Sequence, residues 1–153
     1  MCGGGSGIME AVNEAGSKYK FPTFGLTISL ADEKANVHLK DELHKHLHFH
    51  FFFIRKTILI DTSAFFLIFP GGFGTLDEMF ELLTLFQTNK KLPKPIFLIG
   101  TDYWKGLIAW LKNTVLETGK IKPEHLNLFK LVNTSDEILE ILTEKKYRYL
   151  FLD

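Results

Sequence analysis

A glycine-rich segment between two apolar patterns constrains this 153-residue chain most. Residues 70–75 read Pro-Gly-Gly-Phe-Gly-Thr and follow the unbroken apolar run 64–69, which is typical of a strand buried on both faces. Behind the glycines, apolar residues recur at the spacing of one helix face, namely Leu76, Met79, Phe80, Leu83 and Phe86. A strand, a glycine turn and a helix in this order indicate a phosphate-binding element, because glycines let backbone N–H groups approach an anion and a helix N-terminus carries partial positive charge.

The rest of the chain alternates strands and helices in the same way. Apolar spacing predicts helices over 8–19, 49–62, 104–115 and 134–142, and strands over 24–30, 95–100 and 129–132, with a surface loop over 31–45. Strands that alternate with helices form parallel sheets covered by helices. We therefore expect one α/β domain over residues 1–153, a Rossmann-like parallel sheet with helices on both faces, whose ligands bind beyond the carboxyl ends of the strands.

A second glycine turn, Gly3–Gly7, precedes the first predicted helix. Such a turn normally follows a buried strand, yet only Met1 and Cys2 stand before it. We expect this chain to be the C-terminal part of a longer one.

Charge and composition exclude several classes of function. Eighteen basic residues balance eighteen acidic ones, so the sequence has no basic surplus for nucleic-acid phosphates or a membrane surface. No apolar run approaches the roughly 20 residues of a membrane helix. A single cysteine and an N-terminus without a signal-peptide pattern favour the cytoplasm. Fifteen phenylalanines indicate a large core or a subunit interface.

The glycine segment suits a monophosphate. Thr75 adds a hydroxyl donor, whereas the lysine of a triphosphate-binding Walker loop is absent after Gly74. Glu78 has two interpretations, because Thr75 and Glu78 have the spacing of a helix capping box and a carboxylate can also serve chemistry. Arg55 and Lys56 are likewise either a solvated edge or ligand donors.

The histidines at 44, 46, 48 and 50 are interpreted as surface residues at a loop-to-helix junction rather than a metal site. Pairs at i, i+4 spacing exist, but no HExxH motif, cysteine partner or carboxylate set accompanies them.

Three segments together resemble the LONELY GUY family of cytokinin riboside 5′-monophosphate phosphoribohydrolases. They are the glycine turn with its helix start at 3–11, the segment Phe52–Lys56, and the PGGxGTxxE pattern at 70–78. The similarity continues through 85–88, Tyr103-Trp104 and the final helix. Relatives carry two further strands and a helix before the GGGSG turn, and many have proline where this chain has Ser6.

The resemblance implies a Rossmann-like homodimer, without a cofactor, that hydrolyses a purine nucleoside 5′-monophosphate, including an N6-modified adenosine, to free base and ribose 5-phosphate. By motif, Glu78 and Arg55 match the catalytic pair, and the 5′-phosphate falls to Gly71, Gly72, Gly74 and Thr75. Gly4, Gly5, Met9 and Lys56 complete the nucleotide pocket. Members are often labelled lysine decarboxylases, but no lysine here has the partner acid that a pyridoxal ring requires.

A function from another class is a nucleotide-binding or carrier protein of related Rossmann type, which holds a phosphate without chemistry. Simple phosphate binding requires neither Arg55 nor Glu78, so the presence of both favours the enzyme.

Overall fold

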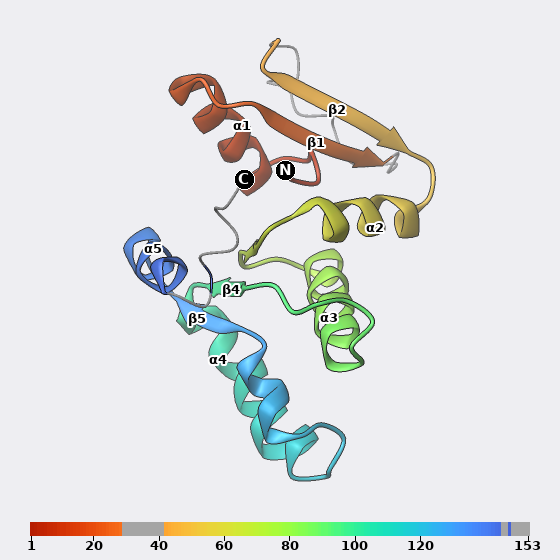
Figure 1. Cartoon of the computed structure of the whole chain (residues 1–153), viewed down its shortest axis with the longest axis vertical. Coiled ribbons are helices and arrows are strands. Elements are labelled where there is room, and N and C mark those ends of the chain that lie inside the picture. The colour runs from red at the N-terminus through yellow and green to blue at the C-terminus, as the bar shows by residue number, and fades with distance from the viewer. Residues whose placement is uncertain (29–41, 145–146, 148–153) are drawn as a thin grey trace. The chain divides into compact units, whose positions relative to one another are not determined.

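The computed structural model describes residues 1–28, 42–144 and 147. The chain divides into two compact units, Met1–Ser63 and Ala64–Asp153, and each is described by itself. Every strand pair in the described residues is parallel, and the strands form two small sheets with helices between them in the chain. The predicted α/β class is therefore confirmed (Figure 1).

The first unit is built on a parallel strand pair. Helix α1 (Ile8–Tyr19) follows the glycine turn, and strand β1 (Thr23–Ile28) pairs with β2 (His44–Phe49) in the register Thr23 to His44. Cys2 forms an isolated parallel bridge to Gly25, in which the Cys2 N–H donates to the Phe24 carbonyl (2.9 Å) and the Cys2 carbonyl accepts from the Leu26 N–H (2.8 Å). Cys2 is thus aligned beside β1 as a strand residue would be, and the turn leaves the carboxyl end of that pairing.

Two predictions in this unit are wrong at their boundaries. The helix expected over 49–62 begins only at Phe52, as α2 (Phe52–Thr62), and the predicted loop over 31–45 gives way at His44 and Lys45 to β2. Most of β2 is exposed, so its sequence lacks the apolar alternation that marks a strand, and pairing with β1 decides its conformation. Residues 31–41 of the predicted loop, and the end of the strand predicted over 24–30, lie outside the described residues.

The second unit has a three-stranded parallel sheet with β4 (Ile96–Ile99) between β3 (Phe66–Ile68) and β5 (Lys130–Val132). Helix α3 (Phe73–Gln87) follows β3, α4 (Thr101–Trp110) follows β4, and α5 (Ser135–Thr143) follows β5. Phe97 and Leu98 of the central strand are fully buried, and α5 packs Ile138 and Leu142 onto Phe97.

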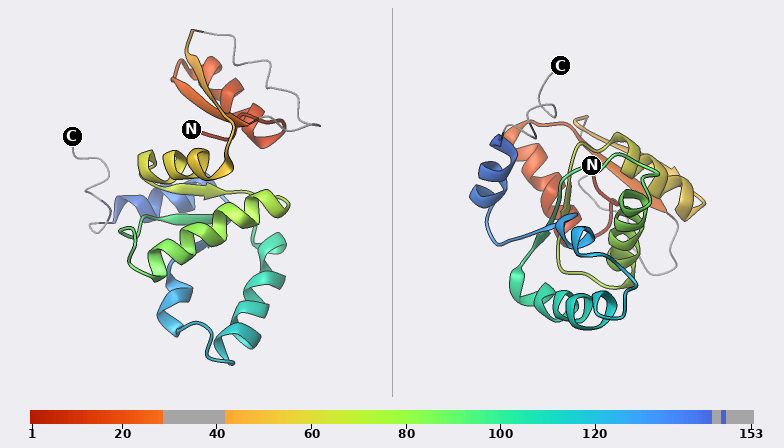
Figure 2. Two further views of the ribbon diagram at one scale, coloured as in Figure 1. Left: turned by 90° about the vertical axis from the view of Figure 1, so that its right-hand side faces the viewer. Right: turned by 60° about the horizontal axis from the view of Figure 1, so that its bottom comes forward.

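The helix predicted over 104–115 begins earlier, at Thr101, as α4. A π-helical segment, Leu111–Leu116, follows α4 without a break, as Figure 2 shows. A short 3₁₀ helix, Pro123–Asn127, precedes β5. Thr134 caps α5 by accepting a hydrogen bond from the Glu137 N–H (3.3 Å), and the Glu137 carboxylate accepts from the Asn133 N–H (3.0 Å). Helices α3, α4 and α5 each begin after the carboxyl end of a strand, where the fold class places ligands.

Candidate functional site

The predicted phosphate cradle is the connection from β3 to α3. Gly72 is the N-cap of α3, without a side-chain cap, and its carbonyl accepts the Leu76 N–H at 3.1 Å. Gly74 and Thr75 lie in the first helical turn. A Cβ on Gly71 would overlap Thr75 Oγ1, whereas a Cβ on Gly72 or Gly74 would meet no atom within 4 Å. The Thr75 side chain therefore occupies the space that Gly71 leaves, and the start of the helix borders open space.

The capping interpretation of Glu78 is wrong. The helix begins at Phe73, so Gly72 rather than Thr75 is the N-cap, and Glu78 is not at the N3 position that a capping box requires. The turn predicted over 70–75 is therefore shorter than expected. Glu78 lies in the second turn of α3 and is half-buried, as is Thr75. A carboxylate at that depth in the helix contributes little to capping the first turn.

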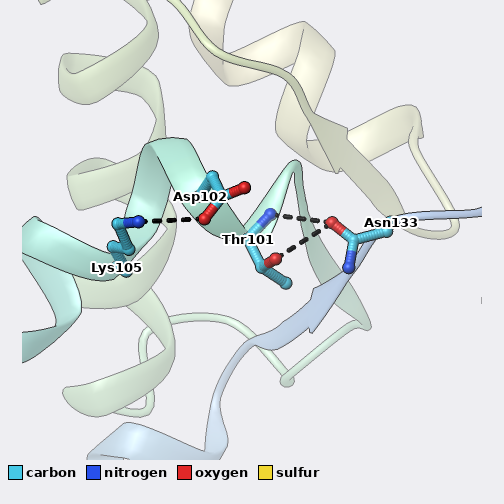
Figure 3. Close-up of polar contacts among 4 residues, drawn as sticks. All are labelled: Thr101, Asp102, Lys105 and Asn133. Atoms are coloured by element: carbon cyan, nitrogen blue, oxygen red, sulfur yellow. Dashed lines mark hydrogen bonds and ion pairs between the residues drawn. The ribbon is translucent and has the colours of Figure 1, made fainter.

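Hydrogen bonds tie together the three loops at the carboxyl edge of the second sheet. Tyr103 Oη, from α4, donates to the Gly71 carbonyl at 2.6 Å. Gly100, with a positive φ of 89°, lies so near Pro70 that a Cβ there would contact the proline Cγ at 3.5 Å. On the other side, the Asn133 Oδ1 accepts from both the N–H (3.0 Å) and the hydroxyl (3.1 Å) of Thr101 (Figure 3).

The start of α4 thus contacts the glycine cradle through Tyr103 and the end of β5 through Asn133. An exposed ion pair between Asp102 and Lys105 (2.9 Å) closes the first turn of the same helix, as Figure 3 shows. Hydrogen bonds and contacts therefore connect the cradle to the start of α4, and α4 to the end of β5.

The first unit contains the other glycine turn. Gly4 and Gly5 are buried. Gly4 has a positive φ of 73°, and a Cβ there would overlap the Thr27 methyl group and approach the backbone of Gly25. Only glycine fits so close to β1 in that conformation.

Met9 and Arg55 meet at this turn. A Cβ on Gly3 would lie 2.9 Å from the Met9 sulfur and 3.0 Å from Arg55 Nη1. Arg55 is half-buried; its Nη1 donates to the Leu26 carbonyl at 3.4 Å and its guanidinium lies 5.7 Å from the centre of the Phe52 ring. Lys56 follows it in α2 and is also half-buried. The guanidinium is thus held between the glycine turn and the carboxyl half of β1, and the interpretation of Arg55 as a solvated edge does not fit this position.

The histidine cluster is not at a loop-to-helix junction. His44, His46 and His48 belong to β2, so the i, i+4 spacing has no helical meaning. His44 is buried, its Nε2 lies 2.6 Å from Ser17 Oγ, and its Nδ1 bonds to the Thr23 hydroxyl, while His48 stacks edge-on against His50 at 5.5 Å. Among the residues that the structure describes, no group of three or more metal-ligating side chains is assembled.

Sequence reasoning missed two residues of these sites. Gly3 contacts both Met9 and Arg55, and Tyr103 bonds to the cradle. Gly3 follows Cys2, which pairs with β1, and Tyr103 lies in the first turn of α4, which follows β4. Their place near a carboxyl edge was the available signal.

None of the helices in the described part of the chain has the length and apolar character of a membrane-spanning segment.

The parallel sheets and the glycine turns at their carboxyl edges define a protein of the α/β, Rossmann-like class. A family model described as "possible lysine decarboxylase" matches residues 8–146, and the chain belongs to that family.

Curated relatives confirm the resemblance to the phosphoribohydrolases. The chain is 36% identical over 86 residues to the cytokinin riboside 5′-monophosphate phosphoribohydrolase of Mycobacterium tuberculosis, a match that covers 56% of this chain and 45% of the relative. It is 33% identical over 91 residues to a probable enzyme of the same name, LOGL2 of rice, Oryza sativa (59% of this chain and 36% of the relative). It is 32% identical over 91 residues to LOG3 of Arabidopsis thaliana (59% and 41%).

These relatives are named for hydrolysis rather than for decarboxylation. The matched segment spans less than half the length of each relative.

Proposed function

We propose that this protein hydrolyses the N-glycosidic bond of a purine nucleoside 5′-monophosphate, including N6-modified AMP, to free base and ribose 5-phosphate. The observation that carries the proposal is the β3–α3 cradle. An open glycine helix start lies there, with a half-buried glutamate one turn further along the same helix. The relatives' names support this reaction class.

Glu78 serves as the catalytic carboxylate in this proposal. Cleavage of an N-glycosidic bond passes through an oxocarbenium-like state, so a carboxylate beside the anomeric carbon stabilises the developing positive charge and takes a proton from the attacking water. The water oxygen bonds to the anomeric carbon, the bonding electrons leave with the base, and the base nitrogen gains a proton from solvent, to which Glu78 returns the proton that it took from the water. The structure supports this role because capping, the competing explanation of Glu78, does not apply.

The cradle holds the 5′-phosphate. Backbone N–H groups of Gly71, Gly72 and Gly74 and the Thr75 hydroxyl are the donors, aided by the partial positive charge at the N-terminus of α3. No lysine is required, since a monophosphate carries less charge than the triphosphate of a Walker loop.

Arg55 orients the departing base or polarises it through hydrogen bonds from its guanidinium. It stays charged throughout and so serves as a donor rather than as the acid. Gly4, Gly5, Met9 and Lys56 line the nucleotide pocket with it. Their support is the packing of Met9 and Arg55 against Gly3 beside two buried glycines.

The protein acts as a cytoplasmic homodimer in this proposal, with its sites near the subunit boundary. Large exposed apolar side chains favour association, among them Phe51, Phe52 and Phe53 on and before α2.

Product analysis tests the reaction. Purified protein is incubated with AMP and with N6-isopentenyl-AMP, and free base and ribose 5-phosphate are quantified by chromatography. We expect both products in equal amounts and in proportion to enzyme, and the ratio of the two rates gives the base preference. Saturable AMP binding without release of adenine after long incubation would contradict hydrolysis and establish the carrier function instead.

A further inference from the structure

We infer that Tyr103 is a positioning residue for the phosphate cradle, which sets the orientation of the Gly71–Gly72 peptide. The inference rests on the proposed function for the identity of the ligand. It does not require that the ligand be hydrolysed.

The contact is specific and comes from a separate element. Tyr103 Oη donates to the Gly71 carbonyl at 2.6 Å across 32 residues of chain. The tyrosine ring packs edge-on against Trp104, with ring centres 4.9 Å apart. Trp104 is fully buried, and its Nε1–H donates to the Ile99 carbonyl at 3.0 Å, so the start of α4 provides a firm base for the tyrosine.

This hydrogen bond acts on the part of the cradle with the most backbone freedom. Gly71 and Gly72 both lack a Cβ, and glycine has access to more backbone conformations than any other residue. The peptide between them is planar and trans, so its C=O and N–H point in opposite directions. By holding the Gly71 carbonyl on the α4 side, Tyr103 turns the Gly72 N–H to the opposite side.

Helix α3 fixes the other end of the same glycine. The Gly72 carbonyl accepts the Leu76 N–H at 3.1 Å, so both peptides that flank Gly72 are held when Tyr103 is in place. A donor that is oriented before binding costs less entropy when an anion arrives. Tyr103 should therefore strengthen binding of the phosphate group and leave the cleavage step to other residues.

The Tyr103 side chain is half-exposed, so it is not part of the core of its unit. Replacing it with phenylalanine removes only the hydroxyl and keeps the ring against Trp104. Loss of one hydrogen bond that preorganises the loop is expected to weaken binding of AMP and ribose 5-phosphate by about fivefold. Binding of adenosine, which has no phosphate, should not change.

The experiment measures dissociation constants of AMP, ribose 5-phosphate and adenosine by calorimetry for wild type and Tyr103→Phe. The matched control is Tyr19→Phe, because Tyr19 is an exposed tyrosine in the other unit whose ring lies beside the Lys18 ammonium. Where turnover occurs, KM for AMP should rise by the same factor, with the loss appearing in KM rather than in kcat.

The outcomes separate this inference from the proposed reaction. Weaker binding of both phosphate ligands by Tyr103→Phe alone supports the inference even if wild type releases no base, a result that would overturn only the proposed hydrolysis. Equal affinities in wild type and variant, an equal loss for adenosine, or no binding of AMP by wild type would each overturn the inference.

Discussion

Asn13 is fully buried in α1, and its side-chain amide has no hydrogen-bond partner within the described residues. A buried amide without partners is costly, because its bonds to water are lost and not replaced. The apolar spacing of residues 8–19 does not mark this position, because the residues that carry it, such as Ile8, Val12 and Tyr19, are exposed, and the buried residues of α1 are Asn13 and Gly16.

Replacing Asn13 with leucine should stabilise the protein. Leucine has nearly the same branched shape, removes the unpaired donor and acceptor, and favours the helix more. We therefore expect the free energy of unfolding to increase by about 1–3 kcal/mol. Urea denaturation measures the change. Asn113→Leu, at an exposed helical asparagine, controls for helix propensity and should change stability by about 0.5 kcal/mol or less. Equal gains at both positions would show that the buried amide carries no penalty.

At the scale of elements, the strongly patterned segments could be predicted and the weakly patterned ones could not. Helices α1 and α5 and strand β4 follow from apolar spacing and boundary residues and lie where the sequence predicts them, and α3 follows from apolar spacing but begins earlier than predicted. Strand β2 does not, because its conformation comes from pairing with β1 and from the buried His44 rather than from its own pattern. The first residue of α3 was also missed, and with it the true position of Glu78.

Two glycines at the start of α3 should respond to alanine in opposite directions. A Cβ on Gly71 would overlap Thr75, so Gly71→Ala forces the loop or the threonine to move and should cost about 1–3 kcal/mol. A Cβ on Gly74 meets nothing within 4 Å, so Gly74→Ala should gain about 0.5–1 kcal/mol from helix propensity.

Thermal unfolding of the two alanine variants beside wild type measures this pair. If Gly71→Ala were as stable as wild type, the packing of Thr75 against the loop would not constrain the cradle. If Gly74→Ala were the less stable variant, the helix would not begin where the structure places it.

At the scale of the molecule, the sequence motifs predict the family, and the comparisons confirm it. The motifs could not show how the edge of the second sheet is bonded together. The link from Tyr103 to Gly71 and the link from Asn133 to Thr101 join residues far apart in the chain, and only the parallel order of β3, β4 and β5 brings them together. Site residues supplied by local spacing are therefore predictable, whereas those supplied by topology require the fold.

We expect Glu78 to perform chemistry rather than to support the helix. Glu78→Gln keeps the size and shape of the side chain and removes its charge and basicity. AMP affinity should therefore stay within about threefold of wild type while base release falls by about 10²-fold or more. Asp77→Asn, at the exposed neighbouring acid, removes the same charge and should retain turnover.

The most direct measurement is the rate of adenine release from saturating AMP by wild type, Glu78→Gln and Asp77→Asn, with AMP affinity determined in parallel. We expect all three proteins to bind AMP. Of the three, Glu78→Gln should be the one that releases almost no adenine. Normal release by Glu78→Gln would contradict the account and leave Glu78 without a catalytic role.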